Sequence, residues 1–249
     1  MDSARYNLIP SSDELSLKPG DVHVWRVSLD QDSTYVNTMF RTLSSDERQK
    51  AESYCFDEDR NRFVVARGTL RKILGECLNS DPSRICFAYK QFGKPFVNLA
   101  GNQIRFNITH SRGLALFAVA LGREVGIDLE FIDKNFPIVK TARRIFSLIK
   151  CEELQTLEPD LQAAAFFQGW TLEEAYLKAI GTGFSNPGKH YTDREIPAAP
   201  DCSFMTARRE NSRDWTFANL AVDRNYKAAL AVKGKIGDIR YHRIDTENL

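Results

Sequence analysis

The residues best suited to chemistry are three carboxylates and a lysine on two short segments. Asp128 and Glu130 stand two residues apart in the sequence GIDLE. A spacing of two places both side chains on one face of a β-strand. Glu174 and Lys178 are four residues apart in a helix-like segment, which places them on one helix face. If the two pairs converge, three carboxylates favour a hard cation such as Mg²⁺.

Basic side chains in two further segments could bind phosphate. His110 lies in the polar sequence Asn107–Ser111, which follows an apolar, strand-like run. Lys94 lies in FGKP at Phe92–Pro95, which predicts a tight turn that projects the lysine. With Lys178 and a magnesium site, these cations suit phosphoryl transfer, in which the protein mainly positions groups and neutralises charge. The sequence contains neither GxxxxGKS/T nor GxGxxG, so a P-loop or a dinucleotide-binding fold has no support.

Each cluster also has an ordinary structural interpretation when it is taken alone. Glu174 and Lys178 could be a common helical ion pair, which contributes roughly a few tenths of a kcal/mol. His110 could be structural, and Asp128 and Glu130 could be two solvated acids at a strand edge. The functional hypothesis therefore depends on the convergence of all three clusters.

The elements that hold these residues are predicted from hydrophobic periodicity and capping signals. Alternating apolar residues over Asp21–Leu29 predict a strand, and Ser44 with Glu47 forms a capping box that opens a short helix. A long helix is expected over Asp57–Leu78, with one apolar face and one basic face. Its inward residues would be Phe63, Ala66, Leu70, Ile73, Leu74 and Cys77, and its outward basic residues Arg60, Arg67, Arg71 and Lys72. The other expected strands are Ile85–Tyr89, Ile104–Thr109, Leu114–Ala120, Val125–Glu130, Trp215–Val222 and Tyr226–Val232.

A second long helix is expected within Ala163–Phe184, where Gly181 supplies a stop. The sequences RGTLRKILG at Arg67–Gly75 and EEAYLKAIG at Glu173–Gly181 align, each with a closing glycine. This similarity indicates an internal duplication.

The composition is that of an ordinary globular chain. Of 249 residues, 43% are hydrophobic and 27% are charged, and the formal net charge of +1 argues against a dedicated nucleic-acid binder. Length and duplication together predict an α/β (α+β) fold of two pseudo-symmetric halves, residues 1–122 and 123–249. Each half is expected to hold a small, mostly antiparallel sheet packed against a long helix.

Cysteines and apolar runs bear on the compartment. Five scattered cysteines without a CxxC motif fit reduced, buried thiols better than a disulfide framework or a zinc site. The segment before Asp21 contains no apolar core, so no secretory signal is expected. The longest apolar run, Leu114–Leu121, is far too short to span a bilayer. We therefore expect a cytoplasmic protein without a membrane segment.

The three clusters, in this order and spacing, resemble the 4′-phosphopantetheinyl transferases of the long, Sfp-like type. The matching sequences are FNITHS at Phe106–Ser111, GIDLE at Gly126–Glu130 and W-x-x-x-E-A-x-x-K-A-x-G at Trp170–Gly181. Lesser matches are LSSDERQK at Leu43–Lys50 and FGKP at Phe92–Pro95, and the sequence DVHVWRVSLD is similar to cyanobacterial members.

The resemblance implies an enzyme that moves the phosphopantetheine arm of coenzyme A onto a serine of an acyl, peptidyl or polyketide carrier protein. Such enzymes serve fatty acid, polyketide or nonribosomal peptide synthesis, release adenosine 3′,5′-bisphosphate, require Mg²⁺, are usually monomers, and have their active site at the interface of the two halves. By position, Asp128, Glu130 and Glu174 would hold Mg²⁺, and Glu174, Lys178 and His110 would be catalytic. The residues that contact coenzyme A would be Lys50, Lys90, Gly93, Lys94, Thr109, His110 and Lys178. The segment Gly181–Glu195 would lie near the incoming carrier.

Two positions depart from the family pattern. Lys150 stands where the family commonly has Glu, and Glu173 stands where it commonly has Lys. We hypothesise that they form a reversed ion pair; two unrelated surface changes are the alternative. The serine proton would go to a metal-bound water or to a carboxylate such as Glu174. The competing functions are a catalytically weak binder of coenzyme A and carrier protein and, less favoured, a generic magnesium phosphohydrolase.

Overall fold

Two four-stranded sheets organise the chain, one in each of two units. The computed structural model describes residues 17–182, 205–209 and 212–244. Within these, the first unit comprises residues 17–88, 95–122 and 237–244, and the second comprises residues 89–94 and 123–236. The predicted α/β class is therefore confirmed, and the division into halves at residue 122 stays a prediction.

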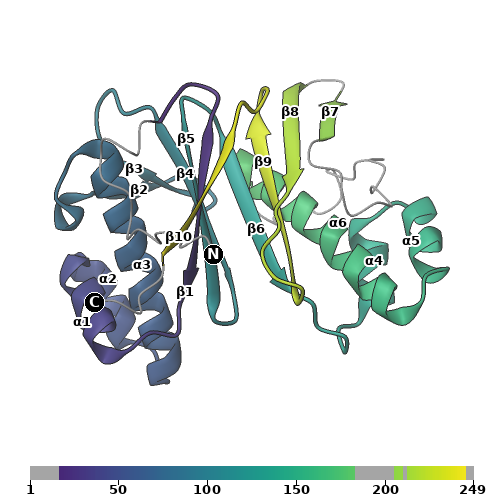
Figure 1. Ribbon diagram of the computed structural model, residues 1–249, viewed down its shortest axis with the longest axis horizontal. Coiled ribbons are helices and arrows are strands. Elements are labelled where there is room, and N and C mark those ends of the chain that lie inside the picture. The colour runs from purple at the N-terminus through teal and green to yellow at the C-terminus, as the bar shows by residue number, and fades with distance from the viewer. Residues whose placement is uncertain (1–16, 183–204, 210–211, 245–249) are drawn as a thin grey trace, which may run out of the picture. The chain divides into compact units, whose positions relative to one another are not determined.

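The sheet of the first unit has the strand order β10-β1-β5-β4. Strand β1 pairs antiparallel with β5 and parallel with β10, and β5 pairs antiparallel with β4. The helices of this unit gather on one face of the sheet (Figure 1). The bounds are β1 (Val22–Ser28), β4 (Ile104–Ser111), β5 (Leu114–Leu121), β10 (Ile239–Ile244), α1 (Ser33–Thr42), α2 (Ser45–Glu52), α3 (Asp57–Leu78) and the 3₁₀ helix η1 (Pro82–Arg84).

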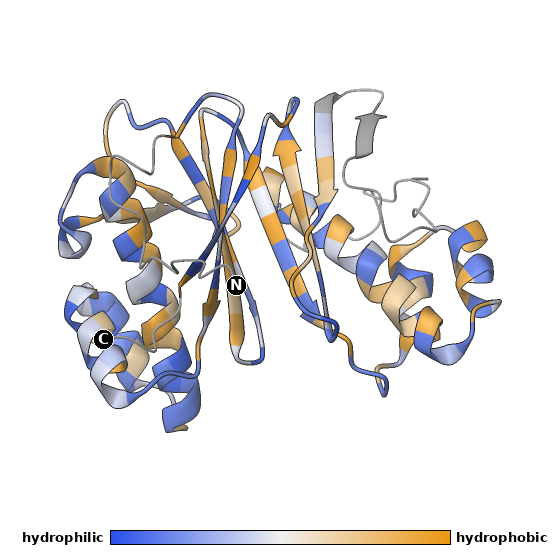
Figure 2. Cartoon of the chain, viewed as in Figure 1, coloured by the Kyte–Doolittle hydropathy of each residue, from blue (hydrophilic) through white to orange (hydrophobic). Residues whose placement is uncertain are grey.

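Helix α3 supplies the apolar face that covers this sheet. It begins at Asp57 and ends at Leu78, as predicted, and Asn79 closes it in the left-handed conformation with φ 46°. Its expected inward residues lie in or against the core, together with the fully buried Trp25 of β1. Figure 2 shows hydrophobic residues along the strands and mostly hydrophilic residues on the outer faces of the helices of this unit.

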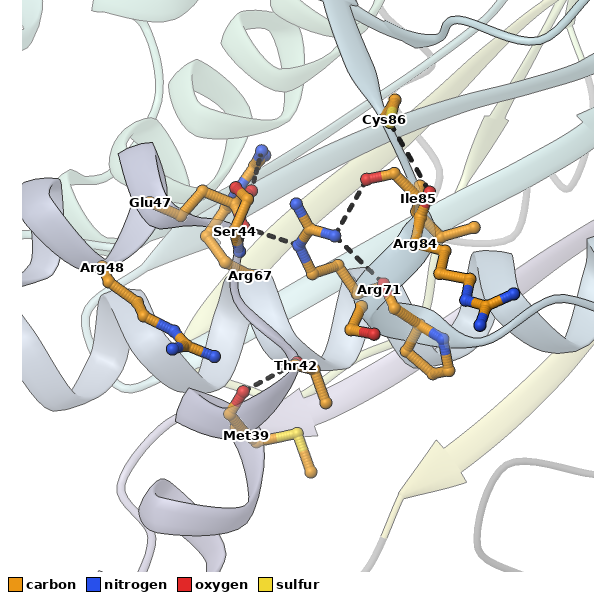
Figure 3. A network of polar contacts seen from close by, with 12 residues as sticks. Met39, Thr42, Ser44, Glu47, Arg48, Arg67, Arg71, Arg84, Ile85 and Cys86 are labelled. Carbon is orange, nitrogen blue, oxygen red and sulfur yellow. Dashed lines mark hydrogen bonds and ion pairs between the residues drawn. The ribbon is translucent and has the colours of Figure 1, made fainter.

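The basic face predicted for α3 is wrong at two positions. Arg71 is 1% exposed, and its Nε donates to Oε2 of Glu47 at 2.5 Å, while Arg67 donates to Oε1 of the same carboxylate (Figure 3). Burial raises the pKa of Glu47, but the two guanidinium groups outweigh it and hold this pKa below its usual range. A buried carboxylate is stable only with such positively charged partners. The spacing of charged residues along α3 does not show that Arg67 and Arg71 serve as partners of this kind. The expected capping box is present, because Glu47 also accepts from the N–H of Ser44 at 3.1 Å.

The sheet of the second unit has the order β6-β9-β8-β7, and all its strand pairs are antiparallel. Helix α6 packs along this sheet, and the first half of α6 also packs against α4 and α5. The bounds are β6 (Val125–Phe131), β7 (Met205–Arg209), β8 (Ser212–Asn219), β9 (Tyr226–Lys233), α4 (Ile138–Ile145), α5 (Leu148–Gln155) and α6 (Pro159–Ile180). Each unit thus combines a sheet with a 22-residue helix, as predicted.

The aligned repeat holds for the helices but not for their closing glycines. Gly181 closes α6 with φ 75°. Gly75 instead lies inside α3, where an added Cβ would stand 2.8 Å from the carbonyl oxygen of Ser80. Gly75 is therefore required for close packing of the following turn and not for ending the helix.

Several elements differ from expectation, and the strands among them form through tertiary pairing. Helix α1, strands β7 and β10, and the short strand β3 (Pro95–Val97) were not predicted, and β8 begins and ends three residues before the expected strand. Strand β2 (Phe87–Tyr89) is shorter than expected. Cys55 and Cys86 are free, as expected, but exposed rather than buried, and Cys202 lies outside the described residues. None of the described helices is long and apolar enough to cross a membrane.

Candidate functional site

Strand β6 and helix α6 approach each other at Gly126. A Cβ built on Gly126 would lie 2.0 Å from the carbonyl oxygen of Ala175 and 2.4 Å from the amide nitrogen of Ala179. Only glycine permits this approach. Because side chains alternate along a strand, Asp128 and Glu130 share the face of Gly126, which is the face that α6 covers.

Asp128 and Lys178 form the closest contact of this arrangement. The Nζ of Lys178 lies 2.5 Å from Oδ1 of Asp128, and the carboxylate is buried. Glu130, partly buried on the same face, stands opposite Lys227 in the pairing of β6 with β9. The structure therefore brings the predicted lysine of α6 onto the first predicted acid of β6.

Glu174 completes the group one turn earlier on α6. It is 9% exposed, and its Oε1 makes no hydrogen bond to any described part of the chain. Burial and the charges of Asp128 and Glu130 raise the pKa of Glu174 to about 7, although Lys178 opposes the shift. The three carboxylates therefore lie within electrostatic range of one another, which is the convergence expected within this unit.

The donor set fits a hard divalent cation in its chemistry. Carboxylate oxygens are the ligands that Mg²⁺ prefers, and crowded buried carboxylates are stabilised by positive charge. Among the residues that the structure describes, no three side chains of His, Cys, Asp or Glu already stand in an arrangement that could hold a metal ion. The cation now beside Asp128 is the ammonium of Lys178. The magnesium site stays a prediction.

Lys94 lies in the predicted turn, between β2 and β3, where Gly93 has φ 82°. The turn is confirmed, but the expectation that it projects the lysine is wrong, because Lys94 is 8% exposed. Its Nζ donates to Oε2 of Glu124 at 3.0 Å and to the carbonyl oxygens of Val125 at 3.1 Å and Ala179 at 2.7 Å. An ammonium group has three protons, and these three oxygens all lie within hydrogen-bond distance of it.

Lys90 opens the same turn and contacts the same acid. Its Nζ lies 3.0 Å from Oε1 of Glu124, and its side chain is 42% exposed. Burial raises the pKa of Glu124, but Lys94 and Lys90 outweigh it and lower this pKa overall. Sequence reasoning missed Glu124. In the sequence, Glu124 is recognisable only as an acid that directly precedes an apolar strand. An acid at such a position is equally common in an exposed turn.

The remaining predicted residues belong to the first unit. Thr109 and His110 are consecutive in β4, so their side chains face opposite sides of the strand, with Thr109 buried and His110 exposed. Lys50 is exposed at the end of α2, with Nζ 5.3 Å from the ring centroid of Phe63. Their predicted contacts with coenzyme A stay predictions, as does their meeting with the acids of β6. Most of the proposed carrier-facing segment, from residue 183 on, lies outside the described residues.

Comparison with known families and proteins agrees with the motifs. Residues 25–121 match the family described as 4′-phosphopantetheinyl transferase, N-terminal, and residues 124–231 match the 4′-phosphopantetheinyl transferase superfamily. The 4′-phosphopantetheinyl transferase HetI of Nostoc sp. is 36% identical over 232 residues, which cover 92% of this chain and 95% of HetI. The 4′-phosphopantetheinyl transferase gsp of Aneurinibacillus migulanus is 32% identical over 61% of both chains. Sfp of Bacillus subtilis is 29% identical over 58% of this chain and 63% of its own.

Proposed function

The chain belongs to the 4′-phosphopantetheinyl transferase superfamily and is a transferase of that kind, and we propose that it moves the phosphopantetheine arm of coenzyme A onto a serine of a carrier protein. The observation that carries this proposal is the cluster of Asp128, Glu174 and Lys178 where β6 meets α6. A generic phosphohydrolase would need the acids but not all three motifs of the family in the same order along one chain.

The acids of the cluster would hold the magnesium ion that the reaction requires. Asp128, Glu130 and Glu174 would be its ligands, and when bound the ion would neutralise the diphosphate of coenzyme A and stabilise the departing bisphosphate. Lys178 would supply a second, fixed positive charge at the oxygens where negative charge grows. The serine proton would go to a metal-bound water or to a carboxylate such as Glu174.

The similarity to phosphopantetheinyl transferases also supports the proposed substrates, coenzyme A and a carrier protein. Lys50, Lys90, Thr109 and His110 would contact coenzyme A, with Gly93 giving the turn its shape. The acceptor would be an acyl, peptidyl or polyketide carrier, and the enzyme would act as a cytoplasmic monomer. Docking of the carrier would place its serine hydroxyl in line with the β-phosphoryl group, which converts a bimolecular attack into a positioned one.

The direct experiment is incubation of the protein with an apo-carrier, coenzyme A and Mg²⁺, followed by intact mass measurement of the carrier. We expect a mass gain of one phosphopantetheine arm. Asp128→Asn should abolish this gain, whereas Asp160→Asn, at the exposed start of α6, should not. Binding of coenzyme A or carrier without a mass gain would favour the catalytically weak binder instead.

A further inference from the structure

We propose that Lys94 is a positioning residue, which fixes strand β6 against the C-terminal turn of helix α6. The inference rests on the proposed function, because the two elements it joins carry the acids and the lysine of the candidate site. It differs from the role of a phosphate ligand, which the sequence of the turn alone suggests.

The contacts of Lys94 join three segments that are distant in sequence. The ammonium donates to the carbonyl oxygens of Val125 at the start of β6 and of Ala179 near the end of α6. It also pairs with Glu124, which directly precedes β6. We call these four residues the Lys94 cluster. All four residues lie in the second unit, so the cluster belongs to one compact body.

Local physics favours this role for a buried ammonium. The last carbonyl groups of a helix have no partner within the helix and carry the negative end of its dipole. Ala179 is one of these positions, and its contact with Lys94 is the shortest of the three at 2.7 Å. If the ammonium moved to a phosphate, the carbonyl groups of Ala179 and Val125 and the carboxylate of Glu124 would lose their hydrogen bonds to it. Loss of a hydrogen bond by a buried polar group costs free energy.

The glycine that ends α6 makes room for the lysine stem. Gly181 has φ 75°, and a Cβ added there would lie 3.3 Å from Cδ of Lys94. A side chain at this position would therefore both strain the backbone and press on the lysine. The same stem packing explains why Lys94 is buried although it follows an exposed turn.

The Lys94 cluster stands close in sequence to the reacting groups on both elements. Val125 is three residues before Asp128 on β6, and Ala179 directly follows Lys178 on α6. Between them Gly126 allows the backbones to touch. A change in the spacing at the cluster would therefore be transmitted to the separation of Asp128 from Lys178, and catalytic groups tolerate little displacement.

Lys90 pairs with the same carboxylate through a side chain that is 42% exposed, so it provides a matched control for hydrogen exchange, and an exposed lysine far from the cluster in sequence serves as the control for activity. We expect Lys94→Met to lower kcat for transfer by about tenfold or more, and by the same factor with coenzyme A and with 3′-dephospho-coenzyme A, while KM stays nearly constant. Lys134→Met, which removes an exposed lysine paired with Asp160, should leave kcat unchanged. A rise in KM for coenzyme A alone, with kcat retained, would show that Lys94 binds the 3′-phosphate and would overturn the inference.

Hydrogen exchange gives a readout that does not depend on activity. The amides of Gly181 and Thr182 donate to the carbonyl oxygen of Leu177, at 2.9 and 3.3 Å, in the turn that Lys94 contacts. They should exchange faster in Lys94→Met and in Glu124→Gln but not in Lys90→Met. A wild-type protein that transfers nothing would overturn the proposed function, whereas unchanged exchange in Lys94→Met would overturn the positioning role.

Discussion

The ammonium of Lys178 lies 2.5 Å from Oδ1 of Asp128, so a lysine of α6 supplies the positive charge at the buried acid of β6. The same lysine is expected to serve the phosphates of coenzyme A. A metal ion bound beside Asp128 would release the ammonium for that role. Lysine and magnesium should therefore compete for this carboxylate before coenzyme A binds.

Replacement of Lys178 by Met should separate metal binding from catalysis. Transfer should fall by about 100-fold or more, because a fixed charge on the growing anion is lost. Binding of Mg²⁺ to the protein without coenzyme A should become tighter, because the competing ammonium is gone. Titration calorimetry measures the affinity, and Lys134→Met, which removes an exposed lysine paired with Asp160, is the control. Weaker metal binding in Lys178→Met would contradict the competition.

Glu174 predicts a specific dependence of stability on pH. Its pKa in the folded protein, about 7, lies above the ordinary value of 4.5. The folded state thus favours the protonated carboxyl, and without metal its stability should fall as pH rises from about 4.5 through 7. A shift of this size corresponds to a loss of order 3 kcal/mol.

Glu174→Gln should remove this loss, because glutamine does not ionise. Urea unfolding in metal-free buffer at pH 5 and pH 8 should show a stability difference that is smaller in Glu174→Gln than in the wild type. Glu152→Gln, an exposed acid on α5, should retain the wild-type difference. Equal pH dependence in wild type and Glu174→Gln would show that Glu174 is not the titrating group.

Gly126→Ala tests the close approach of β6 and α6. The new methyl group would overlap the backbone of α6 at Ala175, so we expect a loss of about 3 kcal/mol or more in unfolding free energy. Gly101→Ala meets no neighbour within 4 Å and also replaces a glycine of positive φ, 73°, so it measures backbone strain alone. An unchanged unfolding free energy in Gly126→Ala would show that the backbones do not constrain each other.

Lys150 and Glu173 allow a test of the reversed ion pair. Lys150 is 8% exposed at the start of α5, where its N–H donates to the hydroxyl of Ser147, and Oε2 of Glu173 is buried. Lys150→Glu and Glu173→Lys should each lower transfer, and the double reversal should recover most of it. Independent, additive losses in the double variant would remove the ion-pair hypothesis.

The sequence predicted those features correctly that depend only on residues close together in the chain. The apolar periodicity of α3, the capping box at Ser44 and the shared face of Asp128 and Glu130 all needed only neighbouring residues. The parallel pairing of β1 with β10 brings together opposite ends of the chain, and no local pattern reports it.

Burial of charge was the other property that the sequence did not reveal. Arg71 was predicted to be exposed because it falls on the basic face of a helix, and Lys94 because it falls in a turn. The partners of Arg71 are Glu47 and two carbonyl oxygens, 11 to 24 residues away, and those of Lys94 are Glu124 and two carbonyl oxygens, 30 to 85 residues away. A charge is buried only when such partners are supplied by the tertiary fold.

The most direct test of the account is a crystal structure with coenzyme A and Mn²⁺ in place of Mg²⁺, in which anomalous scattering locates the metal. The account predicts one strong peak bounded by the carboxylates of Asp128, Glu130 and Glu174, with Lys178 turned from Asp128 toward the phosphates. A metal bound elsewhere, with Lys178 still paired to Asp128 in the presence of coenzyme A, would contradict it.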